Sequence, residues 1–185
     1  VYPPTILKTL KKNDSVATFF VVGSRVGAFS DVVKRENELG MSIGSHSWDH
    51  SKLTKLSKTA LSEQKTKTNN AISAVTGKGA SLLRPPYGAT NQSVSEVFGV
   101  PVILWSVDTL DWKTRDKDAT VKAVMNSVKD GDIVLMHDIY KSSADAAVEL
   151  IPKLVGAGYK LVTVEELAAA KLGGLIPGQK YSAMR

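Results

Sequence analysis

Short apolar segments alternate along the chain with longer stretches in which apolar residues recur at helical spacing. Most of the short segments are apolar throughout, as expected for strands covered on both faces. The predicted strands span residues 16–22, 41–45, 81–83, 102–107, 133–136 and 160–163. The predicted helices span residues 4–12, 30–38, 55–75, 92–97, 118–128, 144–154 and 164–170. This alternation predicts an α/β fold with parallel strands joined by helical crossovers.

The predicted strands are too few for a closed eight-stranded barrel, which usually needs ~250 residues. Six strands in this order could form an open sheet or an incomplete barrel. Pro3 and Pro4 lead straight into a helix with no strand before it, so we expect a strand to be missing upstream. Residues 1–171 are predicted to form one domain. Residues 172–185 are rich in glycine and are predicted to form a surface tail.

Composition narrows the class of protein. With 43% hydrophobic and 23% charged residues, the 185-residue chain has the composition of one ordinary globular domain. It has no cysteine, which excludes thiol nucleophiles and disulfides and leaves the compartment open. No apolar run approaches the ~20 residues that span a bilayer, so no membrane span is expected.

The net charge of +6 has three candidate reasons, namely nucleic acid, an anionic envelope polymer and plain solubility. Five lysines crowd one region without the interleaved aromatic residues that a stacking platform needs. They are Lys52, Lys55, Lys58, Lys65 and Lys67. This pattern favours a solvated helix face over a nucleic-acid site.

All three histidines follow predicted strands, where functional residues of parallel α/β folds gather. His46 and His50 are four residues apart, so both rings would project from one face if the segment turned helically. Two imidazoles on one face could bind a divalent metal ion. Spacing alone leaves a pair of surface or capping histidines equally open. His137 ends a strand beside Asp138 and suits general acid or base work.

Two further loops carry charged or aromatic residues. In the segment 84–88, two prolines fix a turn in which Arg84 could orient a carboxylate, although a rigid loop with a surface arginine is the commoner reason for such a motif. Asp108, Asp111 and Trp112 end another apolar strand, and either acid could simply cap the next helix.

Taken in order, these segments resemble the NodB-homology polysaccharide deacetylases, which form carbohydrate esterase family 4. The family motif H-[ST]-x-x-H corresponds to residues 46–50 and R-P-P-[YF]-G to residues 84–88. D-x-x-D-W corresponds to residues 108–112 and L-x-H-D to residues 135–138. Residues 17–20, Ala-Thr-Phe-Phe, look most like the bacterial peptidoglycan N-acetylglucosamine deacetylases.

The resemblance implies a distorted (β/α) barrel and metal-dependent removal of acetyl groups from N-acetylated sugars. It implies that His46 and His50 bind the metal, most readily zinc, with cobalt or another divalent ion as alternatives. His137 would be the general acid, Asp111 would orient it, and Arg84 would hold the base. The amide of Tyr87 would stabilise the oxyanion, while Trp112 and Leu135 would wall the acetyl pocket.

The family's first motif, T-F-D-D-G-P, is absent, because the chain contains no Asp-Asp pair. The resemblance would place the base and the third metal ligand on that motif. A truncated chain, a first strand supplied by a separate polypeptide and a degenerate homologue are three explanations. The first two are favoured because the other motifs are intact. Asp49 also departs from the small polar residue usual there, and a solvent-facing position is expected for it.

The leading hypothesis is an extracellular or envelope-associated deacetylase whose polysaccharide substrate is peptidoglycan, since a basic protein suits an anionic wall. Chitin oligomers and acetylated xylan are the alternative substrates. The rival classes are a non-catalytic glycan-binding homologue that lacks its base and a nucleic-acid binder. The last rests on net charge alone, so no nucleic-acid partner is expected.

Overall fold

The computed structural model describes residues 2–185, which form two compact units. Unit 1 comprises residues 2–17, 105–172 and 182–185, and unit 2 comprises residues 18–104 and 173–181. The chain therefore passes from one unit to the other several times. Each unit is described by itself.

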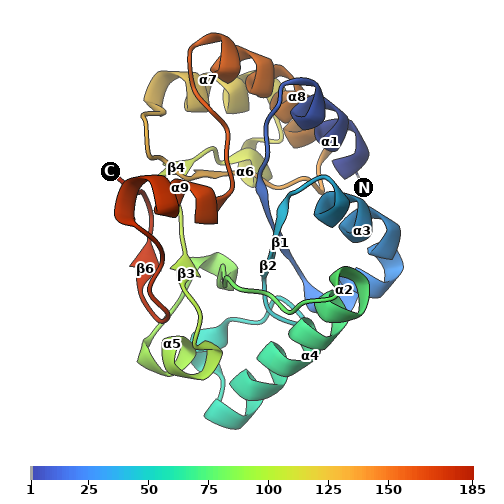
Figure 1. Cartoon of the computed structure of the whole chain (residues 1–185), viewed down its shortest axis with the longest axis vertical. Coiled ribbons are helices and arrows are strands. Elements are labelled where there is room, and N and C mark those ends of the chain that lie inside the picture. The colour runs from blue at the N-terminus through green and yellow to red at the C-terminus, as the bar shows by residue number, and fades with distance from the viewer. Residues whose placement is uncertain (1) are drawn as a thin grey trace. The chain divides into compact units, whose positions relative to one another are not determined.

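Unit 2 is built on a run of parallel pairings. Strand β1 (Thr18–Val21) pairs in parallel with β2 (Ser42–Ser45), with Thr18 opposite Ser42, and Figure 1 shows the two side by side. Single parallel bridges then join Ser45 to Leu83 and Leu83 to Val102. Strand β3 (Val102–Ile103) pairs in parallel with β6 (Lys180–Tyr181). The parallel pairing of β1 with β2 and the parallel bridges to Leu83 and Val102 agree with the predicted parallel arrangement.

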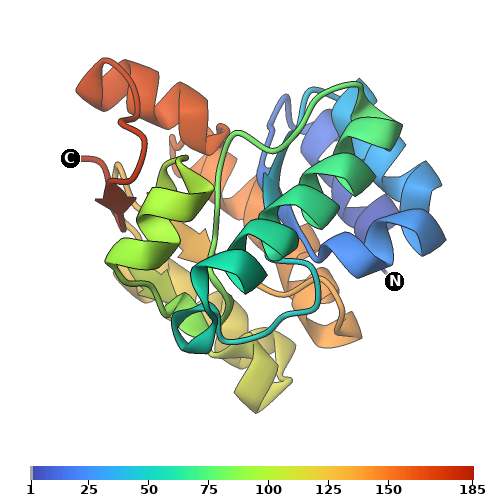
Figure 2. The same cartoon turned by 90° about the horizontal axis from the view of Figure 1, so that it is seen from below.

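Helices of unit 2 begin and end at local signals in the sequence. The side chain of Ser57 accepts a hydrogen bond from the amide of Ala60, and Gly77 ends the same long helix in the left-handed conformation, which only glycine adopts at little cost. This helix, α4, runs diagonally across Figure 2. Asn91 caps α5 in the same way as Ser57 caps α4. The helices are α2 (Gly23–Val26), α3 (Ser30–Glu38), α4 (Lys58–Thr76) and α5 (Gln92–Phe98), with 3-10 turns at Gly27–Phe29, Leu53–Lys55 and Pro86–Gly88.

Buried apolar side chains of unit 2 form two clusters. One cluster joins the Leu83 segment and β3 to α4 and α5, and it contains Leu53, Leu61, Leu83, Val94, Phe98 and Val102. The other joins β2 to the helices α2, α3 and α4, and it contains Val26, Val33, Ile43 and Ile72. These clusters fix the ends of β2 and of the Leu83 segment. The motifs at residues 46–50 and 84–88 follow directly after these ends.

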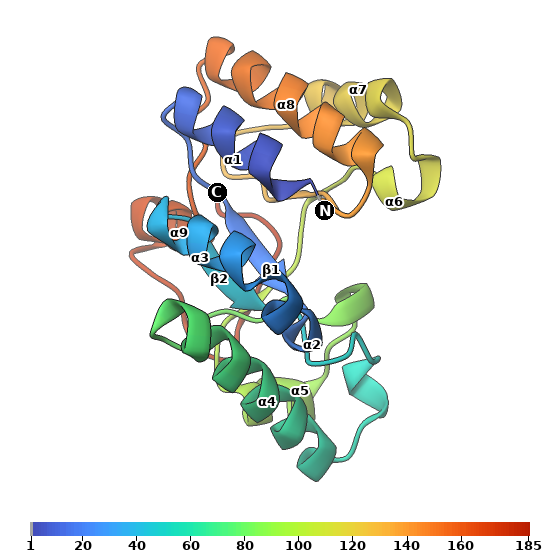
Figure 3. The same ribbon diagram turned by 90° about the vertical axis from the view of Figure 1, so that its right-hand side faces the viewer.

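Unit 1 contains one parallel strand pair and the remaining α-helices of the described residues. Strand β4 (Val107–Asp108) pairs in parallel with β5 (Val134–Leu135). The core cluster contains Val107, Val121, Val124, Ala146, Leu150 and Leu154. Figure 3 shows α1 lying along α8. The helices are α1 (Pro3–Lys12), α6 (Asp111–Thr114), α7 (Lys117–Ser127), α8 (Lys141–Gly156) and α9 (Val164–Leu172).

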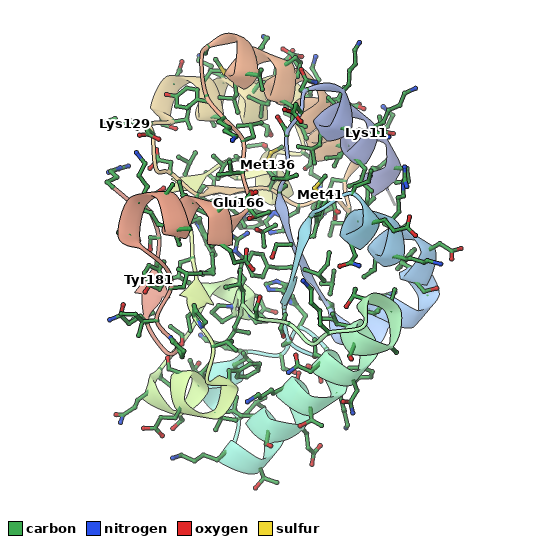
Figure 4. The ribbon with its side chains drawn as sticks, in the orientation of Figure 1. Lys11, Met41, Lys129, Met136, Glu166 and Tyr181 are labelled. Carbon is green, nitrogen blue, oxygen red and sulfur yellow. The ribbon has the colours of Figure 1, made fainter. Side chains whose placement is uncertain are left out.

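Helix α9 begins with a capping box. The carboxylate of Glu166, labelled in Figure 4, accepts from the amide of Thr163 at 2.8 Å, while the hydroxyl of Thr163 accepts from the amide of Glu166 at 3.2 Å. This reciprocal pair satisfies two helix-end amides and explains why the predicted helix at residues 164–170 forms.

The final residues take part in both units. Tyr181 belongs to β6 in unit 2. Ala183 forms an antiparallel bridge with Asp132 in unit 1, Met184 is 1% exposed, and Arg185 is paired with Asp132. The residues predicted to be a surface tail therefore include a strand and a core side chain.

Two predicted strands are wrong, and a third, at residues 81–83, is present only as the single bridge residue Leu83. Residues 102–107 form not one strand but two, β3 and β4, which belong to different units. The reason is that the carbonyls of Ile103 and Leu104 accept from the guanidinium of Arg84, so the strand ladder stops there. Residues 160–163, all described, form no strand, although the amide of Val16 donates to the carbonyl of Leu161 at 3.2 Å. An apolar run alone does not separate a strand from a packed loop.

The short elements α2, α6 and β6 had no sequence prediction, since two to four residues carry too little pattern. No helix within residues 2–185 combines the length and the apolar character needed to cross a membrane.

Candidate functional site

His46 and His50 lie in unit 2 on the loop that follows β2. Their ring centroids are 4.9 Å apart and the rings meet edge to face at 64°. The segment between them is not helical, because Ser47 and His50 both have a φ of 65°. The helical turn considered for these residues is therefore wrong. The two imidazoles nevertheless lie together, as the spacing was taken to indicate.

The carbonyl of Arg84 selects the tautomer of His46. It lies 2.6 Å from Nδ1 of the ring, and a carbonyl can only accept, so Nδ1 carries the proton in the neutral ring. The lone pair is then on Nε2. Metal-binding histidines are commonly oriented by such a bond from the other ring nitrogen.

Two serines stabilise the loop from within. The hydroxyl of Ser47 accepts from the amide of His50 at 3.0 Å, and the hydroxyl of Ser45 accepts from the amide of Ser47 at 3.3 Å. Ser47 is fully buried. Asp49 is exposed, and a hydrogen bond from the side chain of Ser51, followed by one from Gln64, holds its pKa below the ordinary value.

The side chain of Arg84 is buried at 8% exposure. Its Nε and Nη2 atoms donate to the carbonyls of Ile103 and Leu104 at 3.4 and 3.1 Å. Its guanidinium carbon lies 4.3 Å from the centre of the Phe20 ring. Burial lowers its pKa to about 10, so the side chain still carries its charge at neutral pH. A surface arginine, the commoner alternative, is excluded.

Tyr87 adopts an unusual backbone conformation, with φ 61° and ψ 11°. Left-handed backbone is costly for a residue with a side chain and is frequent at functional sites. Its ring meets that of His50 edge to face at 4.9 Å and is 66% exposed. The R-P-P-Y-G turn thus brings Tyr87 to the histidine pair.

In unit 1, Asp111 and His137 form a closely bonded pair. The Oδ1 atom of Asp111 lies 2.8 Å from Nδ1 of His137, and Oδ2 accepts from the backbone amide of His137 at 2.7 Å. Asp111 is 1% exposed. Burial raises its pKa, but the hydrogen bonds from His137 outweigh burial and hold the pKa below the ordinary value. Asp111 is therefore an ionised, fixed partner of the imidazole.

The other residues of unit 1 that were considered for the site lie close to Asp111 or His137 in the sequence. Trp112 is 46% exposed and its amide donates to Asp111 at 2.8 Å, whereas Leu135 is buried. Asp108 is exposed and accepts from the amide of Leu110, but Leu110 is the N-cap residue of α6 and this helix has no side-chain cap, so Asp108 does not cap it. Burial raises the pKa of Asp138.

Two supporting residues were missed by sequence reasoning. The hydroxyl of Thr109 donates to the carbonyl of Leu135 at 2.8 Å, which ties the D-x-x-D-W segment to the L-x-H-D segment. Gln64 on α4 accepts from the amide of Trp48 at 2.8 Å. Thr109 lies inside a recognised motif and could have been noticed there, but Gln64 has no local signal.

The histidine pair fits part of a metal site. Imidazole nitrogen suits zinc and related divalent ions, and the tautomer of His46 leaves its Nε2 as the donor. Within residues 2–185, no group of three or more histidine, cysteine, aspartate or glutamate residues is placed to hold a metal. The histidine pair alone is therefore smaller than such a group.

A family model described as polysaccharide deacetylase matches residues 1–99, more than half of the chain. The chain belongs to the polysaccharide deacetylase family. The resemblance inferred from the four motifs is confirmed.

Named relatives of this polysaccharide deacetylase chain are bacterial. The peptidoglycan-N-acetylglucosamine deacetylase PgdA of Listeria monocytogenes is 47% identical over 91% of this chain. The peptidoglycan-N-acetylmuramic acid deacetylase PdaC of Bacillus subtilis is 45% identical over 90% of it. The chain covers 36% of the length of each relative.

Solved structures agree with the family. A structure described as T48 deacetylase with substrate is 39% identical, has a TM-score of 0.93 and is matched over 98% of this chain and 90% of its own. A pseudoenzyme of carbohydrate esterase family 4 from Bacillus anthracis is 36% identical, has a TM-score of 0.84 and is matched over 90% of this chain and 60% of its own. The predicted NodB-type fold, a distorted (β/α) barrel, is confirmed by these structures.

Proposed function

We propose that this polysaccharide deacetylase chain is the catalytic domain of a metal-dependent hydrolase that removes acetyl groups from N-acetylglucosamine residues of peptidoglycan. The observation that carries the proposal is the histidine pair, whose rings lie 4.9 Å apart and in which Arg84 sets the tautomer of His46. The names of the Listeria and Bacillus relatives support the same chemistry and the same polymer.

His46 and His50 are the proposed protein ligands of a divalent ion, with zinc as the proposed metal because it favours nitrogen donors in hydrolytic sites. When bound, the ion would polarise the acetyl carbonyl and lower the pKa of a water molecule. The family's aspartate pair, which would complete the ligands and provide the base, is not among the 185 residues.

His137 is the proposed general acid. Its Nδ1 is bonded to Asp111, so Nε2 is the nitrogen that would deliver a proton to the departing amine. Asp111 would hold the ring in this orientation and place a negative charge beside it. Amide hydrolysis needs this proton because an amine leaves poorly without it.

Three proposed roles concern the substrate and the base. Arg84 would orient the catalytic base, for which its buried and charged guanidinium is suited. The amide of Tyr87 would stabilise the charge that develops on the carbonyl oxygen. Trp112 and Leu135 would line the pocket that accepts the acetyl methyl group.

The proposed location is outside the cell or on its envelope, where peptidoglycan lies. The net charge of +6 would favour association with an anionic wall. Chitin oligomers and acetylated xylan remain the alternative substrates.

Acetate release from the metal-loaded, full-length enzyme on peptidoglycan, chitin oligomers and acetylxylan tests the substrate. We expect the largest release from peptidoglycan, with free amino groups appearing in equal amount. Release from acetylxylan alone would overturn the peptidoglycan proposal.

A non-catalytic glycan-binding homologue is the second candidate. The observation that favours it is the lack of any Asp-Asp pair in a chain that is similar to a pseudoenzyme of the same family. Glycan binding by the metal-loaded, full-length protein without release of acetate would decide for this candidate.

A further inference from the structure

The loop that joins His46 to His50 has a backbone that is costly to hold. Ser47 and His50 are both left-handed, with φ of 65°. This conformation is unfavourable for a residue that has a side chain, because its Cβ atom comes too close to the backbone. Besides the two serine hydrogen bonds within the loop, contacts from outside hold it in place.

Helix α2 supplies contacts on one side of the loop. The amide of Gly23 donates to the carbonyl of Ser47 and the amide of Ser24 donates to the carbonyl of Trp48, both at 2.9 Å. Backbone and ring approach closely here, because a Cβ atom on Gly23 would lie 2.8 Å from the Trp48 ring and 2.7 Å from Thr68 Oγ1. These bonds satisfy the carbonyls of the loop.

Helix α4 supplies contacts through a side chain. The Oε1 atom of Gln64 accepts from the amide of Trp48 at 2.8 Å. Thr68, which closes the space around Gly23, lies one helical turn further along the same face of α4. Trp48 is thus held by its carbonyl from α2 and by its amide from α4.

We propose that Gln64 is a positioning residue of the metal site, because it fixes the loop that carries His46 and His50. The inference rests on the proposed function, in which these two histidines bind the metal. The printed hydrogen bond of the Gln64 side chain goes to the amide of Trp48, so Gln64 acts on the two histidines through the loop. Without it, the loop can leave the conformation that keeps the two rings 4.9 Å apart.

The test replaces Gln64 by methionine, which keeps the length of the side chain and removes its hydrogen bonds. Zn²⁺ binding is measured by competition with a chromophoric chelator on the protein, the Gln64→Met variant and the His46→Ala reference. Residues that orient metal ligands typically change metal affinity by about 10–100-fold, and we expect a loss in this range. Gln92→Met is the matched control, since Gln92 is an exposed helical glutamine that donates to Glu96 and is far in sequence from the loop.

Amide hydrogen exchange at Trp48 in the metal-free protein gives a second measurement. We expect exchange to be about ten-fold faster in Gln64→Met and unchanged in Gln92→Met, since a lost hydrogen bond of typical strength has an effect of this size. Exchange at Trp48 separates a local effect on the loop from a general loss of stability.

The outcomes distinguish the two proposals. Zn²⁺ binding that is within two-fold of the unsubstituted protein in Gln64→Met, or unchanged exchange at Trp48, would overturn the positioning role alone. Zn²⁺ binding that does not depend on His46 would overturn the metal site of the proposed function and this inference with it.

Discussion

The carboxylate of Asp111 holds His137 at two points, with Oδ1 2.8 Å from the ring Nδ1 and Oδ2 2.7 Å from the backbone amide. One oxygen fixes the ring and the other fixes the strand end that carries it. This double contact explains why the aspartate is buried and yet ionised.

Asp111→Asn is expected to lower deacetylation by about 10²–10⁴-fold, the range that general acid–base catalysis contributes. A carboxamide removes the negative charge beside the ring, and its NH2 group can turn His137 to the wrong tautomer. Acetate release at saturating substrate checks this. Asp116→Asn is the control, because asparagine caps α7 as well as aspartate does. Equal loss in both variants would contradict the specific role of Asp111.

Thr109→Val should destabilise the chain by about 1–3 kcal/mol, the cost of leaving buried polar groups without partners. Valine has the shape of threonine but cannot donate to the carbonyl of Leu135. Urea unfolding followed by circular dichroism measures the change. Thr109→Ser keeps the hydroxyl and should recover most of the lost stability, and a serine variant as unstable as the valine variant would count against the hydrogen bond.

Gly131→Ala is expected to destabilise the chain more than Gly158→Ala does. Both have positive φ, 85° and 91°, so alanine costs roughly 1–2 kcal/mol at either position. A Cβ atom on Gly131 would also lie 2.0 Å from the carbonyl oxygen of Met184, whereas nothing lies within 4 Å at Gly158. Thermal unfolding of the two variants separates steric conflict from backbone strain, and equal melting temperatures would show that the Met184 carbonyl moves away freely.

The ionised carboxylate of Glu149 should stabilise the fold, and this stabilisation should disappear at strongly acid pH. Hydrogen bonds from Lys117 and Lys153 lower its pKa from 4.5 to about 2. A lowered carboxyl pKa gives a contribution that is present above the unfolded value and is lost as the pH falls from about 4.5 to about 2. The difference in melting temperature between the protein and Glu149→Gln should therefore shrink over that interval.

Glu63→Gln is the control for this pH dependence, because Glu63 is exposed and contacts one lysine at 3.4 Å. We expect its difference from the unsubstituted protein to stay small at every pH. A Glu149→Gln difference that grows as the pH falls would contradict the sign of the pKa shift.

Much of the helical framework could be predicted from the sequence. The helix at residues 30–38 was predicted with the observed ends. Caps and helical periodicity depend on neighbours in the chain, so they can be recognised without the fold. Strand ends depend on partners distant in sequence, and for that reason residues 102–107 were predicted as one strand.

Site residues that belong to sequence motifs could be predicted, whereas residues that support the site by packing could not. His46 and His50 were identified from spacing and family resemblance, although their loop is left-handed and not helical. Gln64 lies on another element, and nothing in its local sequence indicates contact with Trp48. Such supporting residues emerge only when the fold brings two elements together.

The most direct test compares Zn²⁺ binding and acetate release from peptidoglycan on the same preparations of full-length enzyme carrying no substitution, His46→Ala or His137→Ala. We predict that His46→Ala loses both the metal and the activity, whereas His137→Ala keeps the metal and loses acetate release. Full activity in His137→Ala, or metal-dependent acetate release that survives in His46→Ala, would contradict the division of roles between the two histidines.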